Sequence, residues 1–408
     1  MSKLEKLIQQ YCPDGVEYHP LWSLTAWDKK FNGIDKSKQK RVIKYNYLLA
    51  ADLKSYQVDE GTVKLLTTNI SNLYTSEELA GDLASEGEVV AIPWGGNPIV
   101  QYYKGRFLTA DNRIATSLDT NNLNNKFLYY CMLSQMKLIS SFYRGSGIKH
   151  PEMAKVLDLE IPVPPLPVQE EIVRVLDTFT ELQAELQAEL QKRQQQYNFY
   201  RDNLLNFKNI DRGGQAEVRW MKLKDIGKVC MCKRILKSQT SSSGDVPFFK
   251  IGTFGGNADA YISQALFNEY KSKYSYPQKG DVLISAAGTI GRTIVFDGTP
   301  SYFQDSNIVW LKHDESIVLN SYLRYCYALN PWVVSTGGTI ARLYNDNILE
   351  ATIPVPSLAN QQRIVSILDR FDTLTNDLTS GLPAEMEKRR QQYEFYRDKL
   401  LTFKRKEA

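Results

Sequence analysis

The chain has 408 residues, of which 43% are apolar and 24% charged, and its net charge is +4. That length exceeds one ordinary core, so two or more domains are expected. The mild charge does not by itself indicate a nucleic-acid binder. No run of about eighteen apolar residues occurs, and the start MSKLEKLIQQ lacks the apolar stretch of a secretory signal, so we expect neither a membrane span nor secretion.

Cysteine and histidine usage adds two expectations. The five cysteines are scattered and odd in number, which predicts free thiols in a reducing cytoplasm. The three histidines do not stand at ligand spacing from a cysteine pair, which argues against a structural zinc site.

The first domain is predicted to span residues 1–160, and it contains a basic stretch over 29–47. KKFNGIDKSKQKRVIKYNY interleaves cations with aromatic side chains. Lysines in a flexible stretch neutralise DNA phosphates, although a solvated surface loop is the alternative. The candidate DNA contacts here are Lys36, Lys38, Lys40, Arg41 and Lys44.

A strand, a turn and a helix are predicted next. The run EVVAIPW is typical of a short strand, and WGGNP (94–98) is typical of a turn. Glycines let backbone amides approach a phosphate or a base edge, and asparagine pairs with adenine, so Trp94 and Asn97 are candidates. An ordinary β-turn remains the alternative. Apolar residues over 125–143 predict a helix.

A central helical segment is predicted over 161–210. The prolines of IPVPPLP predict an extended lead-in, and from Val168 to Lys208 apolar residues recur every three or four positions, typical of a long helix with one apolar seam. Within it, ELQAELQAELQK repeats every four residues. Each repeat adds about 6 Å of helix, so the repeat either sets length or is a replication slip in a tolerant helix. Because four exceeds 3.6, its leucines should drift around the helix.

The second domain is predicted over 211–352. DVLISAAG, TIVF and NIVWL are typical of strands, and 321–334 is typical of a helix. Cys230 and Cys232 in KVCMCKRILK fit a strand with small buried side chains better than a metal site. The turn AAGTIGR (286–292) matches WGGNP in position, and arginine pairs with guanine. The candidates are Lys233, Arg234, Lys237, Lys250, Thr289 and Arg292.

A distal helical segment is predicted over 353–408. Its apolar period is interrupted at SGLPAE, where Pro383 suits the first turn of a new helix. We therefore expect a break or kink there.

The chain contains an internal repeat. KRQQQYNFYRDNLLNFK (192–208) and KRRQQYEFYRDKLLTFK (388–404) agree at thirteen of seventeen positions, and IPVPPLPVQEEIVRVLDTF and IPVPSLANQQRIVSILDRF form a second matched pair. The order domain, helix, domain, helix is thus one unit used twice. An isolated helix would expose its apolar seam, so the two helices should cover each other, antiparallel about a pseudo-two-fold axis.

The fold class is therefore α+β: two domains of mixed strands and helices joined by two long, antiparallel, coiled-coil-like helices. The residues expected in the helix pair or in partner docking are Leu182, Leu186, Tyr197, Tyr200, Arg201, Leu374, Leu378, Tyr393, Tyr396 and Arg397.

The repeated helical segments closely resemble the conserved regions of type I restriction–modification specificity subunits, and the resemblance extends over the whole chain. It implies a non-catalytic, cytoplasmic subunit that binds double-stranded DNA, with each target-recognition domain reading one half of a bipartite target. It also implies that the helices set the gap between the halves and dock two adenine methyltransferase subunits, to which restriction subunits add. S-adenosylmethionine, ATP and magnesium are then cofactors of the partners, and none is expected on this chain. WGGNP departs from the more usual Gly-Thr turn, which the second domain retains.

Two other functions remain as alternatives. The first is a self-contained DNA methyltransferase, because NPW (330–332) faintly resembles the Asn-Pro-Pro-aromatic loop of adenine methyltransferases; no glycine-rich cofactor loop precedes it. The second is a coiled-coil scaffold without a DNA role. His19, His150 and His313 lie in polar contexts that indicate no catalytic triad.

Overall fold

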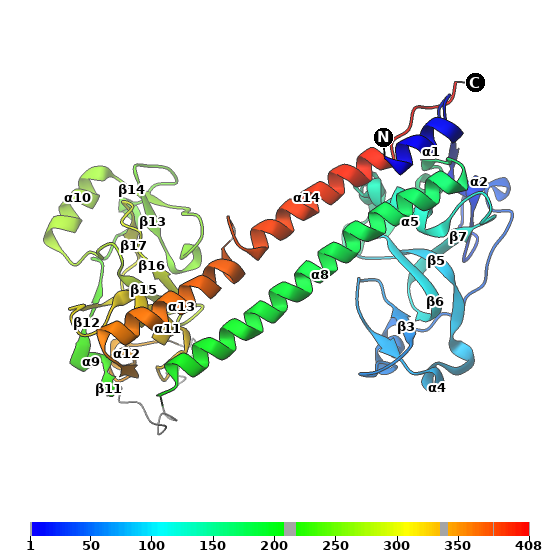
Figure 1. Ribbon diagram of the computed structural model, residues 1–408. Coiled ribbons are helices and arrows are strands. Elements are labelled where there is room, and N and C mark those ends of the chain that lie inside the picture. Colours follow the sequence, from blue (N-terminus) through cyan, green and yellow to red (C-terminus); the bar gives the residue numbers. More distant parts are fainter. Residues whose placement is uncertain (1, 208–217, 335–341, 378, 408) are drawn as a thin grey trace. The chain divides into compact units, whose positions relative to one another are not determined.

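The computed structural model describes residues 2–207, 218–334, 342–377 and 379–407. The chain divides into two compact units: unit 1 comprises Met1–Gln187 and Met386–Ala408, and unit 2 comprises Ala188–Glu385. Each unit contains a sheet, covering helices and part of the long helices (Figure 1). None of the described helices is long and apolar enough to cross a membrane.

Unit 1 is built on a six-stranded sheet and two small pairs of strands. Its strands are β1 (Tyr18–Pro20), β2 (Thr25–Trp27), β3 (Val63–Leu66), β4 (Tyr74–Thr75), β5 (Ser85–Pro93), β6 (Gln101–Thr109), β7 (Asn112–Ser117), β8 (Tyr143–Arg144), β9 (His150–Pro151) and β10 (Glu160–Pro162). Its helices are α1 (Lys3–Tyr11), α2 (Leu21–Leu24), η1 (Lys36–Lys38), α3 (Ala50–Ser55), α4 (Glu77–Ala80), η2 (Gly81–Leu83), α5 (Asn125–Ser134), α6 (Met136–Ser141), α7 (Met153–Leu157) and the first part of α8 (Leu166–Leu205).

The six strands run in the order β2-β7-β5-β6-β3-β4, and only β3 and β6 pair in parallel. The strand predicted from EVVAIPW is confirmed as β5. Val90 and Ile92 face the core that contains Phe127 of α5, while Val89 and Ala91 face a second cluster with Phe107. Burial on both faces explains why this strand reads as a continuous apolar run.

Unit 2 is built on a four-stranded sheet, a three-stranded sheet and one pair of strands. Its strands are β11 (Arg219–Lys222), β12 (Gly227–Met231), β13 (Val246–Phe249), β14 (Tyr261–Ile262), β15 (Val282–Ser285), β16 (Thr293–Val295), β17 (Tyr302–Phe303), β18 (Ile308–His313) and β19 (Thr352–Val355). Its helices are α9 (Leu223–Ile226), η4 (Lys237–Gln239), η5 (Ile251–Thr253), α10 (Gln264–Lys273), α11 (Asn320–Ala328), α12 (Asn345–Leu349), α13 (Leu358–Asn376) and the last part of α8; α14 (Leu382–Leu400) begins in unit 2 and ends in unit 1.

The main sheet of unit 2 has the order β12-β18-β15-β16, and all of its pairs are antiparallel. Val309 and Leu311 of β18 face the core under α11, whereas Ile308 and Trp310 face a separate aromatic cluster. The strands predicted from DVLISAAG, TIVF and NIVWL are therefore confirmed as β15, β16 and β18. Both units bury a central strand on two sides.

Two predicted helices end earlier or divide. The stretch 125–143 forms α5 and α6, which meet at Gln135. The stretch 321–334 is helical only to Ala328, so the predicted C-terminal end was wrong. Asn330 there has a φ of +50° and Pro331 follows, and neither continues a helix.

The long helix α8 starts at Leu166, two residues earlier than the apolar period suggested, with Pro167 in its first turn. Proline is tolerated there because the first amides of a helix have no intrahelical acceptor. The exposures of its repeat leucines confirm the predicted drift: Leu182 is exposed, Leu186 half-buried and Leu190 buried.

In unit 1 the start of α8 packs against the end of α14 (Figure 1). The ring of Phe179 stacks on Tyr396 with centroids 5.6 Å apart. Earlier α8 residues, Val168 and Ile172, share a core with Leu401, which follows α14. Lower numbers on one helix meet higher numbers on the other, so this pair is antiparallel, as predicted.

In unit 2 the same contact recurs between the end of α8 and α13. Tyr200 stacks on Phe371 with centroids 5.3 Å apart, and Leu205 shares a core with Ile364. Each copy of the repeated phrase therefore packs on the helix start that belongs to the other copy.

A buried glutamine fixes the first turn of each of these helices. The Gln169 side-chain amide donates to the carbonyls of Asn122 (2.8 Å) and Pro164 (2.7 Å) and accepts from the Asn124 amide (2.9 Å). Gln361 repeats the pattern with Ile317, Pro356 and Leu319, each at 2.9 Å. The proline lead-in, the helix start and the loop before the late helix are thus joined by one side chain.

The predicted break in the distal segment is confirmed. α13 ends at Asn376 and α14 begins at Leu382, with Pro383 in its first turn. A Cβ on Gly381 would lie 2.4 Å from the Thr373 carbonyl oxygen, so only glycine permits this close approach.

Candidate nucleic-acid interface

In unit 1 the predicted turn at 94–98 joins β5 to β6 and is held against the β8–β9 hairpin. The Trp94 amide donates to the Asp111 carbonyl (2.7 Å), and the Gly96 amide donates to the Lys149 carbonyl (3.0 Å). His150 Nδ1 donates to the Trp94 carbonyl oxygen (2.7 Å). Turn and hairpin therefore form one surface, on which Asn97 is exposed.

Beneath this turn lies a buried ion pair that the sequence did not reveal. The Arg113 guanidinium sits 4.1 Å above the Trp94 ring, and its Nη1 is 3.9 Å from Asp28 Oδ2. Asp28 also accepts from the Ile114 amide (2.9 Å) and the Tyr47 hydroxyl (3.0 Å).

Burial raises the pKa of the Asp28 carboxyl and lowers that of the Arg113 guanidinium, and the opposite charge of each partner limits the shift. Arg113 Nε has no hydrogen-bond partner within the described residues. The two charges offset each other, and the pair fixes the Arg113 guanidinium against the Trp94 ring at the base of the turn.

The basic stretch of unit 1 is held by one buried side chain, Gln39. Its side-chain oxygen accepts from the Phe31 amide (2.8 Å), and its Nε2 donates to the Lys29 carbonyl (3.1 Å). Among the predicted cations, Lys38 pairs with Asp158 at 2.5 Å. The others are exposed: Lys36, Lys40, Arg41 and Lys44.

In unit 2 the turn at 286–292 follows β15 and is closed by its own hydrogen bonds. The Arg292 amide donates to Ser285 Oγ (3.0 Å), and the Gly291 amide donates to the Ser285 carbonyl (2.9 Å). Gly291 has a φ of +79°, and a Cβ there would lie 2.6 Å from Asn330 Oδ1. Thr289 and Arg292 are exposed, and Arg292 Nη2 donates to the Gly255 carbonyl at 3.3 Å.

Three of the cations predicted in unit 2 line one hollow of about 430 Å³: Arg234, Lys237 and Lys250. Arg234 pairs with Asp305 (2.9 Å), and Lys250 pairs with Asp259 (2.8 Å). Lys233 lies apart from them, with its ammonium 5.2 Å from the Tyr274 ring centroid. The three cations Arg234, Lys237 and Lys250 are spread over seventeen positions of the sequence. In the structure they line the same hollow as Gln304 and Asn307.

Cys230 and Cys232 belong to the core cluster that also contains Phe248 and Ala260, two residues that line the hollow. Both thiols are free and buried, as are the other three cysteines. Burial raises the pKa of the Cys232 thiol to about 12, so it stays protonated near neutral pH. No group of three or more potential metal-ligating side chains occurs in the described parts of the chain.

The residues predicted for the helix pair fall into three groups. Tyr200 and Tyr396 stack on the facing helix, and Tyr197 and Tyr393 pack against the two main cores. Arg201 and Arg397 lie over the rings of Tyr197 and Tyr393 at 5.7 Å and 5.8 Å. Leu182 and Leu374 are exposed and Leu186 is half-buried, while Leu378 lies outside the described residues.

Sequence reasoning missed the polar residues that hold these surfaces from below. Asp28, Arg113 and Gln39 lie far apart in the sequence and carry no common spacing. Gln169 and Gln361 did offer a signal, because each stands at the same place in one copy of the repeat, in VQEEIV and NQQRIV.

Comparison with known proteins gives a family match in each half of the chain. The family described as type I restriction modification DNA specificity domain matches residues 32–193 and 216–388. A Haemophilus influenzae protein described as a type I restriction enzyme specificity subunit is 51% identical over 331 residues, covering 78% of this chain and 83% of that protein. The EcoR124I/EcoR124II specificity subunit of Escherichia coli is 31% identical over 438 residues, covering 100% and 98%.

Solved structures share the fold. The S subunit of a type I restriction–modification system from M. genitalium has a TM-score of 0.58 at 15% identity, covering 95% of this chain and 96% of that one. A chain from a study of complex assembly in the type I system has a TM-score of 0.55 at 17% identity, covering 95% and 98%.

Proposed function

Because this chain belongs to the type I restriction modification DNA specificity family, we propose that it reads a bipartite DNA target, with the globular part of each unit reading one half. The observation that carries the proposal is the pair of family matches, one in each half of the chain. As a specificity subunit, the chain is a non-catalytic member of its complex.

We assign the reading surfaces to the two glycine turns and the cations near them. Exposed lysines and arginines neutralise phosphates, while turn amides and side chains such as Asn97 and Arg292 reach base edges. In unit 1 the buried Asp28–Arg113 pair supports this assignment, since it holds Trp94 and therefore the base of the turn in place. In unit 2 the cluster of Arg234, Lys237 and Lys250 supports it.

The catalytic steps belong to partner subunits. We infer that the helices dock two adenine methyltransferase subunits, to which restriction subunits add. S-adenosylmethionine, ATP and magnesium then act in those partners. The complex works in the cytoplasm, where its DNA lies.

The same helices set the gap between the half-sites. α8 is continuous over 40 residues and contains the four-residue repeat ELQA. Deleting one repeat (185–188) shortens the helix by about 6 Å, or one to two base pairs at about 3.4 Å each. The half-sites themselves should stay the same, since no residue of either turn is altered.

The test is the adenine methylation map of the host. Deleting the gene should abolish methylation at a gapped, two-part motif, and the shortened protein should restore methylation at a motif with the same halves and a shorter gap. Replacing residues 185–188 by AEKA keeps the length and serves as the control. An unchanged gap in the shortened protein would overturn the spacer role, and an unchanged map after gene deletion would overturn the recognition role.

A further inference from the structure

Each copy of the repeated phrase leaves one large aromatic side chain in solvent. Phe199 on α8 is 64% exposed, and Phe395 on α14 is 61% exposed. They occupy the same position in NFYRD and EFYRD. Thirteen of seventeen positions are shared by the two copies, yet neither phenylalanine belongs to a buried cluster among the described residues.

The neighbouring tyrosine holds each phenylalanine outside the helix pair. Tyr200 stacks on Phe371 and Tyr396 stacks on Phe179, so these tyrosines face the other helix. Phe199 meets Tyr200 edge-on at 5.6 Å and 76°, and Phe395 meets Tyr396 at 5.4 Å and 75°. Both phenylalanine rings are thus presented in the same way, and helix pairing does not explain their retention.

An aspartate lies on the same helix face, three residues after each phenylalanine. Asp202 and Asp398 are 58% and 57% exposed at their side chains, and each is paired with the preceding arginine at 2.8 Å and 2.7 Å. Those arginines are largely covered, so the carboxylate is the more exposed member of each pair. In unit 1 the Lys399 ammonium also lies 5.9 Å from the Phe395 ring centroid, so the aromatic ring is bordered by both signs of charge. An aromatic ring with a mixed polar rim is typical of a surface that binds a protein.

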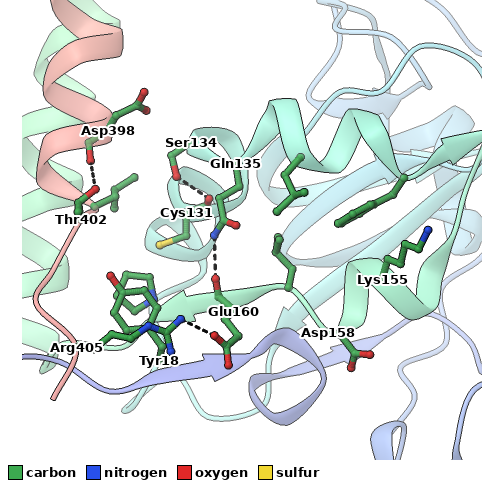
Figure 2. A pocket seen from close by; sticks show the side chains of 15 residues that line it. Tyr18, Cys131, Ser134, Gln135, Lys155, Asp158, Glu160, Asp398, Thr402 and Arg405 are labelled. Carbon is green, nitrogen blue, oxygen red and sulfur yellow. Dashed lines mark hydrogen bonds and ion pairs between the residues drawn. The ribbon is translucent and has the colours of Figure 1, made fainter. Parts of the chain in front are cut away.

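In unit 1 this face borders a hollow of about 740 Å³ (Figure 2). Asp398 of α14 and Thr402, which follows that helix, line one side of the hollow, and Gln135 and Leu138 line it from the α5–α6 region. Phe395 and Asp398 stand at positions i and i+3 of α14, which places them on one side of the helix. An apolar anchor beside a concave, partly polar surface is typical of the centre of a protein–protein interface.

We propose that Phe199 and Phe395 are two equivalent anchors, each of which docks one copy of the adenine methyltransferase subunit. The inference rests on the proposed function and assigns residues to its docking step. The repeated tyrosines pack within the chain, but the repeated phenylalanines are exposed in both units, which suits a partner that binds twice. The methyltransferase is that partner, because each half-site needs its own methylating subunit.

The test is the stoichiometry of the complex formed by the full chain with its methyltransferase subunit, measured by native mass spectrometry. The wild type should bind two copies, and F199A and F395A should each retain one. The double variant should bind neither. The subunits are mixed at a few times the wild-type Kd, because truncating an anchor should raise Kd by about 30-fold, from about 2 kcal/mol at an interface hot spot, and leave that site mostly empty.

Leu49→Ala is the matched control, since Leu49 is 73% exposed and lies outside the repeated phrases. It should leave two copies bound. Thermal unfolding of F199A and F395A alone should match the wild type, because each ring is exposed in the free chain.

The outcomes separate this inference from the proposed function. A wild type that binds two methyltransferase copies, with both single variants doing the same, overturns the anchors and leaves the function intact. A wild type that binds none overturns both. Loss of self-association in the variants, with the methyltransferase still bound, would show that the anchors dock a second copy of this chain and would overturn the proposal.

Discussion

The substitution Gln169→Met isolates the hydrogen bonds that hold the start of α8. Methionine has a similar shape but lacks the amide, so the buried Pro164 carbonyl and the partly buried Asn122 carbonyl and Asn124 amide lose their partner. Three bonds at about 1 kcal/mol each, plus about 1 kcal/mol for the orphaned Asn124 amide, give a loss of about 3–4 kcal/mol. The loss should fall on unit 1, because Gln169 contacts only that unit.

Hydrogen exchange measured peptide by peptide is the suitable assay, since it reports opening in each unit separately. Amides of β1, β10 and α5 should exchange roughly 100-fold faster or more, because about 3 kcal/mol corresponds to two factors of ten. Gln361→Met should give the mirror result in unit 2. Glu170→Met, at the exposed neighbouring position, is the control and should change little.

Two results would refute this reasoning. Wild-type protection in Gln169→Met would mean that the amide hydrogen bonds contribute no net stability. Equal loss of protection in β12, β15 and β18 would mean that the two cores do not open independently.

Three further predictions concern charge and the turn in unit 1. The first replaces the exposed cations of unit 1 by alanine: Lys36, Lys40, Arg41 and Lys44. In DNA-binding measurements on the assembled complex, the slope of log Kobs against log salt should become shallower by up to about 3–4. An unchanged slope would show that these cations do not contact DNA. Trp94→Ala removes the ring against which Arg113 packs, so methylation by the complex should fall and the free energy of unfolding should decrease by about 2 kcal/mol. Full methylation by this variant would contradict the role of the turn. Hydrogen bonds from Arg174 and Lys3 lower the pKa of Glu171 to about 2 from its usual 4.5, so its stabilisation is present above pH 4.5 and is lost as pH falls toward 2. When the free energy of unfolding is measured over that range, its decrease with falling pH should be smaller in Glu171→Gln than in the wild type.

The sequence by itself determined the local elements. The apolar period of three to four predicted the long helices, the runs EVVAIPW and DVLISAAG predicted central strands, and Pro383 marked a helix start. These signals are local, because side chains a few positions apart share a face whatever the rest of the chain does. The duplication could also be predicted from the sequence, because two nearly identical segments, 192–208 and 388–404, are visible without any structure.

Only the tertiary structure decided which distant residues meet. The pairing of Asp28 with Arg113 and the gathering of Arg234 with Lys250 depend on strand order and register, which leave no fixed spacing in the sequence. The same holds for the solvent-facing Phe199 and Phe395. The helical periodicity does not distinguish Phe199 and Phe395 from the apolar residues that become buried. Whether a helix residue is buried depends on which other elements of the chain pack against it.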